Sequence, residues 1–348
     1  MGVVVREADL HRDQAVLIKT LNENRSHTTD THRYRWRYLD NPHGQAKAWL
    51  AIDDKNGTVA GFTVAHPRVM SVEGKAVVCW NCGDFSIHKK YRTLGVAVKL
   101  RSAATQCINR GDPPFLYAHP NDRMTLIHLK VGHKTLGQMV RYARPIGLDR
   151  FLPKLLQGTP VSSGLRRTYH RGLSMLKGAS RFRLPFDCRV VEGFWEDAPY
   201  EDLMAMAKKE WKIVGRRDGS YLKWRFGEQP SQKISTLLLF KKNKLVAYAF
   251  FSLQDRVMHV HDLFSLPEDR VFNGLVAHIT EAAYDYKAET VSIVLLESNP
   301  LIPSLLRNGY LLRPERSNVM VHVFPGFTSG HVIVDEENWF MTVGDRDV

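Results

Sequence analysis

Cysteine is scarce in this chain, with only 4 Cys among 348 residues. Cys79 and Cys82 form a C-x-x-C pair, but no second pair follows that would complete a zinc site. Both residues lie in an apolar run typical of a strand. We therefore expect buried thiols and no bound metal.

Long hydrophobic runs are also missing. No segment approaches the roughly 20 apolar residues that cross a bilayer. The N-terminal sequence MGVVVREADL lacks the apolar region of a signal peptide, and Arg6 stands where a myristoylation motif has Ser or Thr. These absences predict a cytoplasmic protein without a membrane span.

Positive charge is abundant but dispersed. The sequence has 49 Lys and Arg against 36 Asp and Glu, a net charge of +13. It has no basic arm, zinc-finger spacing or RNA-binding signature, so nucleic acid is an unfavoured partner and a small polyanion is favoured. A chain of 348 residues, 44% hydrophobic and 24% charged, predicts two domains with cores of their own.

A short basic turn joins a predicted strand to a predicted helix. The run KAVVCWNC at 75–82 has strand character, and residues 98–109 have apolar side chains at helical spacing. Asp84 to Ala97 lie between the two and lead into the helix. Unpaired N–H groups and the helix dipole favour an anion there, and Gly95 has no Cβ to keep a ligand away. The turn is therefore a predicted anion site.

The remaining patterns of the first half predict a meander followed by alternating helices and strands. Asn56-Gly57 is a hairpin signal between two of the strands. The predicted strands are 3–7, 49–52, 59–64, 114–119 and 135–146, and the predicted helices are 14–24 and 121–131.

The second half repeats landmarks of the first in the same order. Trp36-Arg37-Tyr38 with Pro42 recurs as Trp224-Arg225-Phe226 with Pro230, and Phe85-Ser86-Ile87 recurs as Phe264-Ser265-Leu266. Gly95, Asn121 and Gly132 correspond to Gly274, Asn299 and Gly309. The sequence thus predicts a tandem duplication. Because Val271 replaces the arginine of the turn, we expect no coenzyme in the second copy.

Two motifs of the first half resemble the GNAT superfamily of acyl-CoA-dependent N-acyltransferases. Residues 92–97 match Arg/Gln-x-x-Gly-x-Gly/Ala, and residues 121–133 match the family's later helix at Asn121, Ile127, Lys130 and Gly132. The resemblance implies an α/β (α+β) fold of two tandem domains, each with a mixed, mostly antiparallel sheet flanked by helices. The expected divisions are a catalytic domain 1–146, a basic connector 147–187, a degenerate domain 188–330 and an acidic aromatic tail 331–348.

The same resemblance implies acetyl-CoA, or another acyl-CoA, as co-substrate. The turn would surround its pyrophosphate, the preceding strand would meet its pantetheine arm, and the amide of Asn121 would hydrogen-bond that arm. The implied coenzyme-binding residues are Phe85, Ser86, Ile87, Arg92, Thr93, Leu94, Gly95, Val96, Ala97 and Asn121.

Several residues are candidates for the catalytic groups. His128 stands where the family often has a tyrosine that protonates the leaving thiolate, and it could equally be structural. Asp84 and His119 are candidate bases, and Asp84 could equally neutralise a nearby lysine. Tyr34, Trp36 and Tyr38 could stack on a ring of the acceptor, although their recurrence in the second half favours a core role.

These patterns together predict an N-acetyltransferase acting on a primary amine. The tandem arrangement is similar to bacterial acyltransferases of surface-polysaccharide and amino-sugar pathways, which points to an amino-sugar acceptor. Two alternatives remain: an aminoacyl-tRNA-dependent transferase of the peptidoglycan-bridge type, and a non-catalytic acyl-CoA sensor or scaffold. The sequence leaves open the oligomeric state and whether the tail docks on the body or frays.

Overall fold

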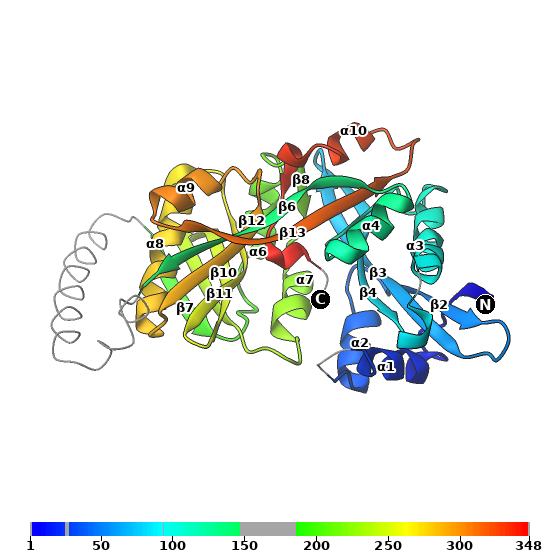
Figure 1. Cartoon of the computed structure of the whole chain (residues 1–348). Helices are drawn as coiled ribbons and strands as arrows, with labels where there is room; N and C mark the ends of the chain where they lie inside the picture. Colours follow the sequence, from blue (N-terminus) through cyan, green and yellow to red (C-terminus); the bar gives the residue numbers. More distant parts are fainter. Residues whose placement is uncertain (1, 25–27, 93, 147–185, 347–348) are drawn as a thin grey trace.

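The computed structural model describes residues 2–24, 28–92, 94–146 and 186–346 (Figure 1). The predicted connector 147–187 therefore falls almost entirely outside the described residues. Among those residues, no helix is both long and apolar enough to cross a membrane.

The first half alternates helices and strands as the sequence patterns predict. The Asn56-Gly57 hairpin lies between its second and third strands, and the basic turn precedes its longest helix. Its elements are β1 (Val3–Glu7), α1 (Gln14–Asn22), α2 (Thr31–Tyr38), β2 (Lys47–Asp53), β3 (Val59–Val72), β4 (Lys75–Ile87), the 3₁₀ turn η1 (Lys89–Tyr91), α3 (Leu94–Ile108), β5 (Phe115–Ala118), α4 (Asp122–Lys130) and β6 (Lys134–Pro145).

The second half repeats this order of elements, with a short strand β8 added. Its elements are β7 (Asp187–Glu192), α6 (Tyr200–Ala207), β8 (Ile213–Gly215), α7 (Gly219–Leu222), the π-helical turn η3 (Lys223–Gly227), β9 (Ser235–Lys241), β10 (Lys244–Gln254), β11 (Val257–Ser265), α8 (Asp269–Asp285), β12 (Thr290–Leu296), α9 (Ile302–Arg307) and β13 (Leu311–Val323). The predicted fold class is confirmed.

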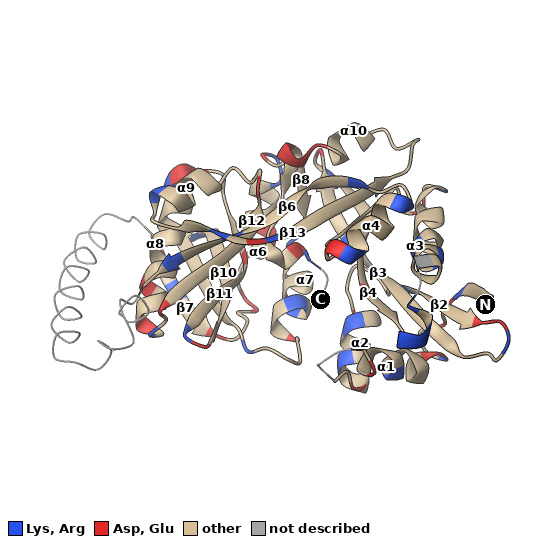
Figure 2. Cartoon of the chain, in the orientation of Figure 1, with Lys and Arg blue, Asp and Glu red and all other residues tan. Residues whose placement is uncertain are grey.

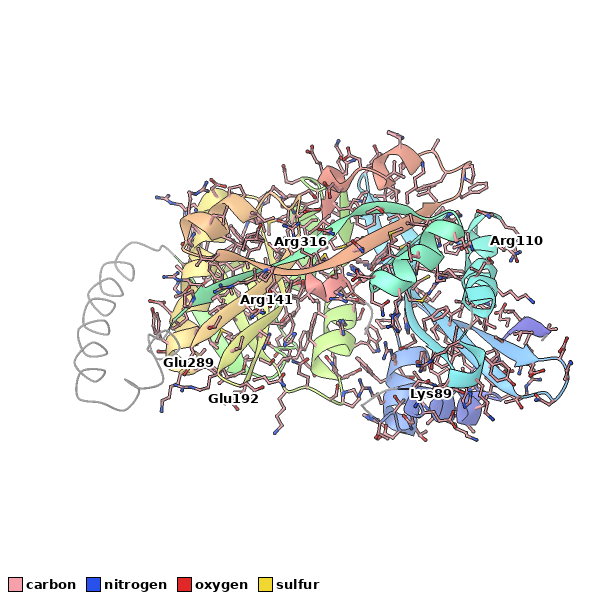
Figure 3. All side chains as sticks on the ribbon, viewed as in Figure 1. Lys89, Arg110, Arg141, Glu192, Glu289 and Arg316 are labelled. Atoms are coloured by element: carbon pink, nitrogen blue, oxygen red, sulfur yellow. The ribbon has the colours of Figure 1, made fainter. Side chains whose placement is uncertain are left out.

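The sheets of the two halves join into one. Its strand order is β1-β2-β3-β4-β5-β13-β6-β12-β11-β10-β9-β7, so the last strand of each half lies beside a strand of the other. β13 pairs with β5 of the first half, while β6 pairs with β12 of the second. β6 and β13 also pair with each other, antiparallel, at the centre of the molecule, where Figure 3 labels Arg141 and Arg316. The two halves thus exchange their final strands.

Helices cover both faces of the first half of the sheet. α3 packs Leu100 and Ala104 against Trp49 of β2, whereas α1 packs Leu17 and Leu21 against Leu50 of the same strand. Successive side chains of a strand point to opposite faces. α3 and α1 therefore lie on opposite sides of the sheet, and α4 contacts α3 on its side.

The repeated tryptophans meet where the halves join. Trp36 Nε1 donates to the carbonyl of Trp224, and Trp224 Nε1 donates to the carbonyl of Trp36, each at 2.8 Å. The two rings stack with their centroids 5.4 Å apart. Corresponding residues of a duplicated sequence thus make one reciprocal contact, which places them at a local two-fold relation between the halves.

The C-terminal tail docks on the body. Its short strand β14 (Trp339–Phe340) pairs with β8, and both tail aromatics are buried. Near its end, Asp345 forms ion pairs with Arg68 of the first half and Arg217 of the second. The tail therefore connects the two halves through buried charges.

Candidate active site

β4 and β5 separate at one end. These parallel strands pair over three residues, ending at Cys82 opposite Ala118. β4 continues to Ile87, and over residues 83–87 it pairs with β3 on one side and with no other described strand. Asp84 has a φ of 41°, and the register against β3 shifts beside it, so a bulge bends β4 at this point. The result is an unpaired backbone edge beside the start of α3.

The turn at the start of α3 is open. A Cβ added at Gly95 would meet no atom within 4 Å, and Gly95 itself is exposed. Arg92 folds back, its Nε donating to the carbonyl of Ile87 at 3.1 Å and its Nη2 to Asn24 Oδ1 at 3.0 Å. Lys89, labelled in Figure 3, and Lys90 add exposed positive charge ahead of α3 (Figure 2). Thr93 lies outside the described residues.

The corresponding position of the second half is closed. A Cβ added at Gly274 would lie 2.6 Å from Cε2 of Phe186. The neighbouring Val271, Phe272, Leu275 and Val276 are buried. Gly274 is the sixth residue of α8 (Asp269–Asp285), so this glycine lies inside a covered turn of the helix and not at its exposed start. The two copies therefore differ in access at this position as well as in sequence.

Val96 and Ala97 are buried against the core beneath the turn. Phe85 and Ile87 pack partly against the same cluster, while Ser86 is buried and donates from Oγ to the carbonyl of Thr20 at 3.4 Å. The predicted residues 85–87 of the strand and 95–97 of the helix therefore share one corner, where the end of β4 meets the start of α3.

α4 begins at Asn121, whose Oδ1 accepts a hydrogen bond from the backbone N–H of Met124 at 3.0 Å. This is the helix-capping role expected of Asn at this position. The residue is exposed. Its amide nitrogen remains a donor for a ligand at the open end of β4 and β5.

His128 is buried and faces His133 rather than solvent. The two Nδ1 atoms lie 2.8 Å apart, and His133 Nε2 lies 3.2 Å from Thr105 Oγ1. Thr105 donates its only hydroxyl proton to the carbonyl of Arg101 at 3.0 Å, so it accepts from His133. His133 Nδ1 is then an acceptor, and His128 Nδ1 is the donor between the rings.

Burial and the charge of Arg101 lower the pKa of both histidines, that of His128 well below its usual value and that of His133 to about 2. Both rings are therefore neutral near pH 7. The single N–H of His128 bonds to His133, which leaves His128 Nε2 as an unprotonated acceptor.

Asp84 lies in a buried polar cluster. Tyr38 donates its hydroxyl to Asp84 Oδ2 at 2.6 Å, and Arg37 Nε lies 2.8 Å from the same oxygen. The ring of His66 stacks on Tyr38 with centroids 5.7 Å apart. The carboxylate is thus paired with a buried arginine rather than with Lys89 or Lys90.

Tyr34, Trp36 and Tyr38 are core residues. All three are buried, Tyr34 donating to the carbonyl of Leu10 at 2.7 Å and Trp36 bonding across the junction of the halves. A sugar or ring acceptor has no exposed face of these rings on which to stack.

His119 follows β5 at the point where β5 leaves β4. Neither ring nitrogen has a hydrogen-bond partner among the described residues. Burial and the charge of Arg346 lower the pKa of His119 to about 3, so its ring is neutral. The end of the chain therefore lies near the open corner.

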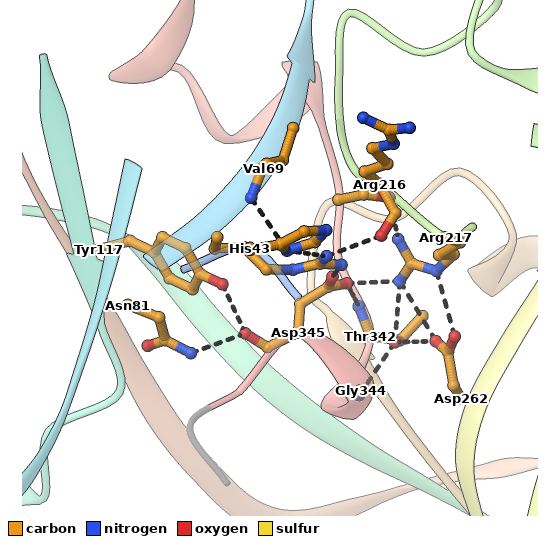
Figure 4. A network of polar contacts seen from close by, with 12 residues as sticks. His43, Val69, Asn81, Tyr117, Arg216, Arg217, Asp262, Thr342, Gly344 and Asp345 are labelled. Atoms are coloured by element: carbon orange, nitrogen blue, oxygen red, sulfur yellow. Dashed lines mark hydrogen bonds and ion pairs between the residues drawn. The ribbon is translucent and has the colours of Figure 1, made fainter. Parts of the chain in front are cut away.

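Figure 4 shows the network that holds this end of the chain. The carbonyl of Asp345 accepts from Tyr117 Oη of β5 at 2.8 Å and from Asn81 Nδ2 of β4 at 3.1 Å. Its carboxylate bonds to Arg68 and Arg217. Residues from both halves and the tail thus meet across β4 and β5 just before these strands separate.

The sequence patterns did not indicate Asp345 or Arg101 as site residues. Asp345 sits in a short tail whose pairing partners are more than 100 positions away, so local patterns carry no signal for it. Arg101 did leave one: it interrupts the apolar helix positions Ala97, Leu100, Ala104 and Ile108. A charge within such a stripe is either at its border or buried.

Comparisons with solved structures identify the fold. The chain is similar to a conserved Enterococcus faecalis protein described as a probable N-acyltransferase, with a TM-score of 0.66 at 9% identity, covering 93% of this chain and 73% of that one. A GCN5-related N-acetyltransferase from Anabaena variabilis gives a TM-score of 0.64 at 14% identity, over 92% of this chain and 73% of that one. The chain shares its fold with these two proteins.

The likeness extends to a eukaryotic enzyme. Saccharomyces cerevisiae N-myristoyltransferase, solved with bound myristoyl-CoA, gives a TM-score of 0.56 at 12% identity, over 100% of this chain and 84% of that one. No protein-family model and no curated protein matches the chain by sequence. Within the described residues, no group of three or more His, Cys, Asp and Glu side chains could hold a metal ion.

Proposed function

We propose that this protein is an acyl-CoA-dependent N-acyltransferase. The observation that supports it most directly is the corner where the unpaired edge of β4 meets the open helix start at Gly95. A diphosphate fits the free N–H groups and dipole of a helix start, and an amide-bearing arm fits an unpaired strand edge. Coenzyme A carries both groups in this order.

The coenzyme site belongs to residues 1–146 in this proposal, and residues 188–330 hold none. The covered position of Gly274, inside α8 and beside Phe186, supports this difference. Arg92, Gly95 and their neighbours receive the pyrophosphate, the backbone of residues 85–87 receives the pantetheine arm, and the Asn121 amide donates to that arm. The second half completes the sheet and bounds the acceptor side.

Acyl transfer requires a neutral amine, a stabilised oxyanion and a place for the charge of the leaving thiolate. Backbone N–H groups near the bulge of β4 supply the oxyanion site. His119 accepts a hydrogen bond from the amine, because its neutral ring has no other partner among the described residues. Asp84 pairs with Arg37 and accepts a hydrogen bond from Tyr38, which holds that ring in place.

The neutral state of His128 argues against an acid at this position. Its N–H bonds to His133, so we propose that His128 contributes an acceptor and not a proton. The acyl group is acetyl and the acceptor a small primary amine in this proposal. An amino sugar remains the preferred class, on the resemblance of the tandem motifs alone.

The test combines binding and turnover. Isothermal titration with acetyl-CoA, followed by a thiol-release assay over a panel of amino sugars and other primary amines, should show coenzyme binding and amine-dependent release. Binding without turnover on any amine would favour the sensor alternative. Failure to bind coenzyme A, with transfer from an aminoacyl-tRNA instead, would favour the peptidoglycan-type alternative.

A further inference from the structure

Arg101 is a buried arginine without a counter-ion. It lies in the middle of α3 and is only 2% exposed. Its Nε and Nη1 atoms have no hydrogen-bond partner, and within the described part of the chain its charge faces the ring of Phe85 and no carboxylate at ion-pair distance. Arg217, which is also fully buried, forms ion pairs with Asp262 and Asp345. Arg101 therefore differs from the structural arginines of this molecule.

Arg101 lies close to two other elements of the proposed active site, β4 and α4. Its guanidinium carbon lies 5.6 Å from the ring centre of Phe85, at the unpaired end of β4. Its charge acts on His128 of α4 and on His133 after it. α3 and α4 pack against each other here. The arginine thus lies between the two helices and behind the free strand edge.

A buried guanidinium without an anion destabilises the fold, because no partner offsets the free energy lost when the charge leaves water. Such a group is kept where a ligand supplies negative charge. The neighbouring histidines cannot do so, since His128 and His133 are neutral and one donates to the other. Among the described residues, Arg101 thus contacts the ring of Phe85 but has no anionic partner.

The position of Arg101 on α3 distinguishes between the phosphates and the sulfur of coenzyme A as its anionic partner. Six residues separate it from Gly95, a rise of about 9 Å along the helix. Phosphates bound at the exposed helix start would remain at that distance. The remaining negative charge of an acyl-CoA reaction develops on the sulfur, at the far end of the pantetheine arm.

We propose that Arg101 stabilises the thiolate of coenzyme A as it leaves the acyl group. This inference depends on the proposed acyltransferase function. The amine nitrogen attacks the thioester carbon, and the C–S bond then breaks with its electron pair on sulfur, opposite the fixed charge of Arg101. The proton of the former amine passes to water. Charge stabilisation replaces proton donation, consistent with a His128 whose N–H is already used.

The experiment measures the thiol pKa of bound coenzyme A through the ultraviolet absorbance of its thiolate. In the wild-type protein this pKa should be at least one unit lower than in free coenzyme A measured in parallel. Arg101→Met should return it to the free value and reduce turnover about a hundredfold, the usual effect of removing one preorganised charge partner. The dissociation constant of acetyl-CoA should change less than threefold.

Two further variants make the result specific. Arg110→Met removes an exposed arginine just beyond the end of α3 and should change none of these quantities. Arg101→Lys keeps the charge and should retain a lowered thiol pKa, which provides the test if Arg101→Met does not fold. Without ligand, Arg101→Met should raise the melting temperature, because it removes an uncompensated buried charge. A lower melting temperature would indicate an arginine that stabilises the fold.

Equal thiol pKa values in wild type and in both Arg101 variants would overturn the inference. So would a wild-type preference for a succinylated over an acetylated coenzyme that Arg101→Met abolishes, since the anion would then belong to the acyl chain. Absence of coenzyme binding and of thiol release in the wild-type protein would instead reject the acyltransferase proposal itself.

Discussion

Single residues distinguish the two copies of this duplicated chain. Gly95 and Gly274 correspond in sequence, but space surrounds the first and Phe186 covers the second. The difference is not visible in either glycine. It arises from side chains that pack beside Gly274 and from the place of each glycine in its helix, since Gly95 is the second residue of α3 and Gly274 the sixth of α8.

Gly95→Glu should abolish coenzyme binding without loss of stability. The added Cβ meets no atom within 4 Å, so folding is unaffected, whereas the carboxylate repels a diphosphate at the helix start. We expect the dissociation constant of acetyl-CoA to rise at least about a hundredfold, because two negative charges at close range repel each other. Calorimetric titration measures it.

Gly95→Gln is the matched control, with the same size and no charge. It should weaken binding less than Gly95→Glu. Unchanged affinity in both variants would show that no phosphate approaches this residue.

Asp345 is the residue on which both halves depend. Burial works to raise its pKa, but Arg217 and Arg68 hold the pKa below its usual value. Asp345→Asn leaves two buried arginines with less compensation and should lower the free energy of unfolding by about 3–5 kcal/mol. Urea denaturation measures the loss, and exposed Asp54→Asn should cause almost none. A small effect at Asp345 would mean that water replaces the carboxylate.

At the scale of elements, the tryptophan pair connects α2 to η3. Each indole donates to the other's carbonyl, so replacing either by Phe leaves one buried carbonyl without its donor. Trp36→Phe and Trp224→Phe should each lower the free energy of unfolding by about 1–3 kcal/mol. Because the contact is reciprocal, the two losses should be similar.

A double-mutant cycle tests whether the tryptophans act as a pair. The double variant should lose less than the sum of the single losses, since neighbouring residues are coupled. Strictly additive losses would contradict a shared contact. Urea denaturation of the four proteins provides the data.

Much of the element pattern followed from the sequence. The hairpin at Asn56-Gly57 was predicted, and the helices predicted at 98–109 and 121–131 are observed at Leu94–Ile108 and Asp122–Lys130, because turn residues and apolar periodicity act locally. The repeat predicted that Trp36 and Trp224 correspond, and the structure brings them into contact. Local chemistry and internal repetition were sufficient for these features.

The exchange of β6 and β13 could not be predicted in this way. The burial of neither strand follows a simple alternation that would fix its partner, and the pairing depends on contacts more than 100 residues apart in sequence. Arg101 was missed for a related reason. The apolar positions around it in α3 allow a place at the border of the stripe or in the interior, and which of the two applies depends on how α4 packs against α3.

At the scale of the whole molecule, the exchanged strands make the halves interdependent. Residues 1–146 alone would lack β13, which covers β5, and would leave β6 without β12. An exposed strand edge of this kind promotes association. We expect a fragment of residues 1–146 to aggregate when expressed alone and to be rescued by co-expression with residues 186–348. Size-exclusion chromatography distinguishes the outcomes, and a monomeric, folded fragment would contradict the interdependence.

Buried histidines should make the whole molecule sensitive to acid. Among the described residues, burial lowers the pKa of six of them, His259 included, below the reference value of about 6.5. The values are about 3 for His43 and His119, about 2 for His133 and about 4 for His261, and His128 shifts in the same direction. Unfolded histidines take up protons below pH of about 6.5 while the folded ones stay neutral, so acid favours unfolding.

The free energy of unfolding should therefore be constant above pH of about 6.5 and fall below it, by up to about 1.4 kcal/mol per pH unit for each histidine. Asp345 acts in a lower window, because its lowered pKa loses stability only below its ordinary value of 3.8. Urea denaturation between pH of about 7.5 and 4.5 isolates the histidines. His119→Leu should reduce the slope of the unfolding free energy against pH by the amount that corresponds to about one proton. Exposed His32→Asn should leave this slope unchanged. A stability that does not vary over this range would mean that the buried rings already carry protons in the folded state.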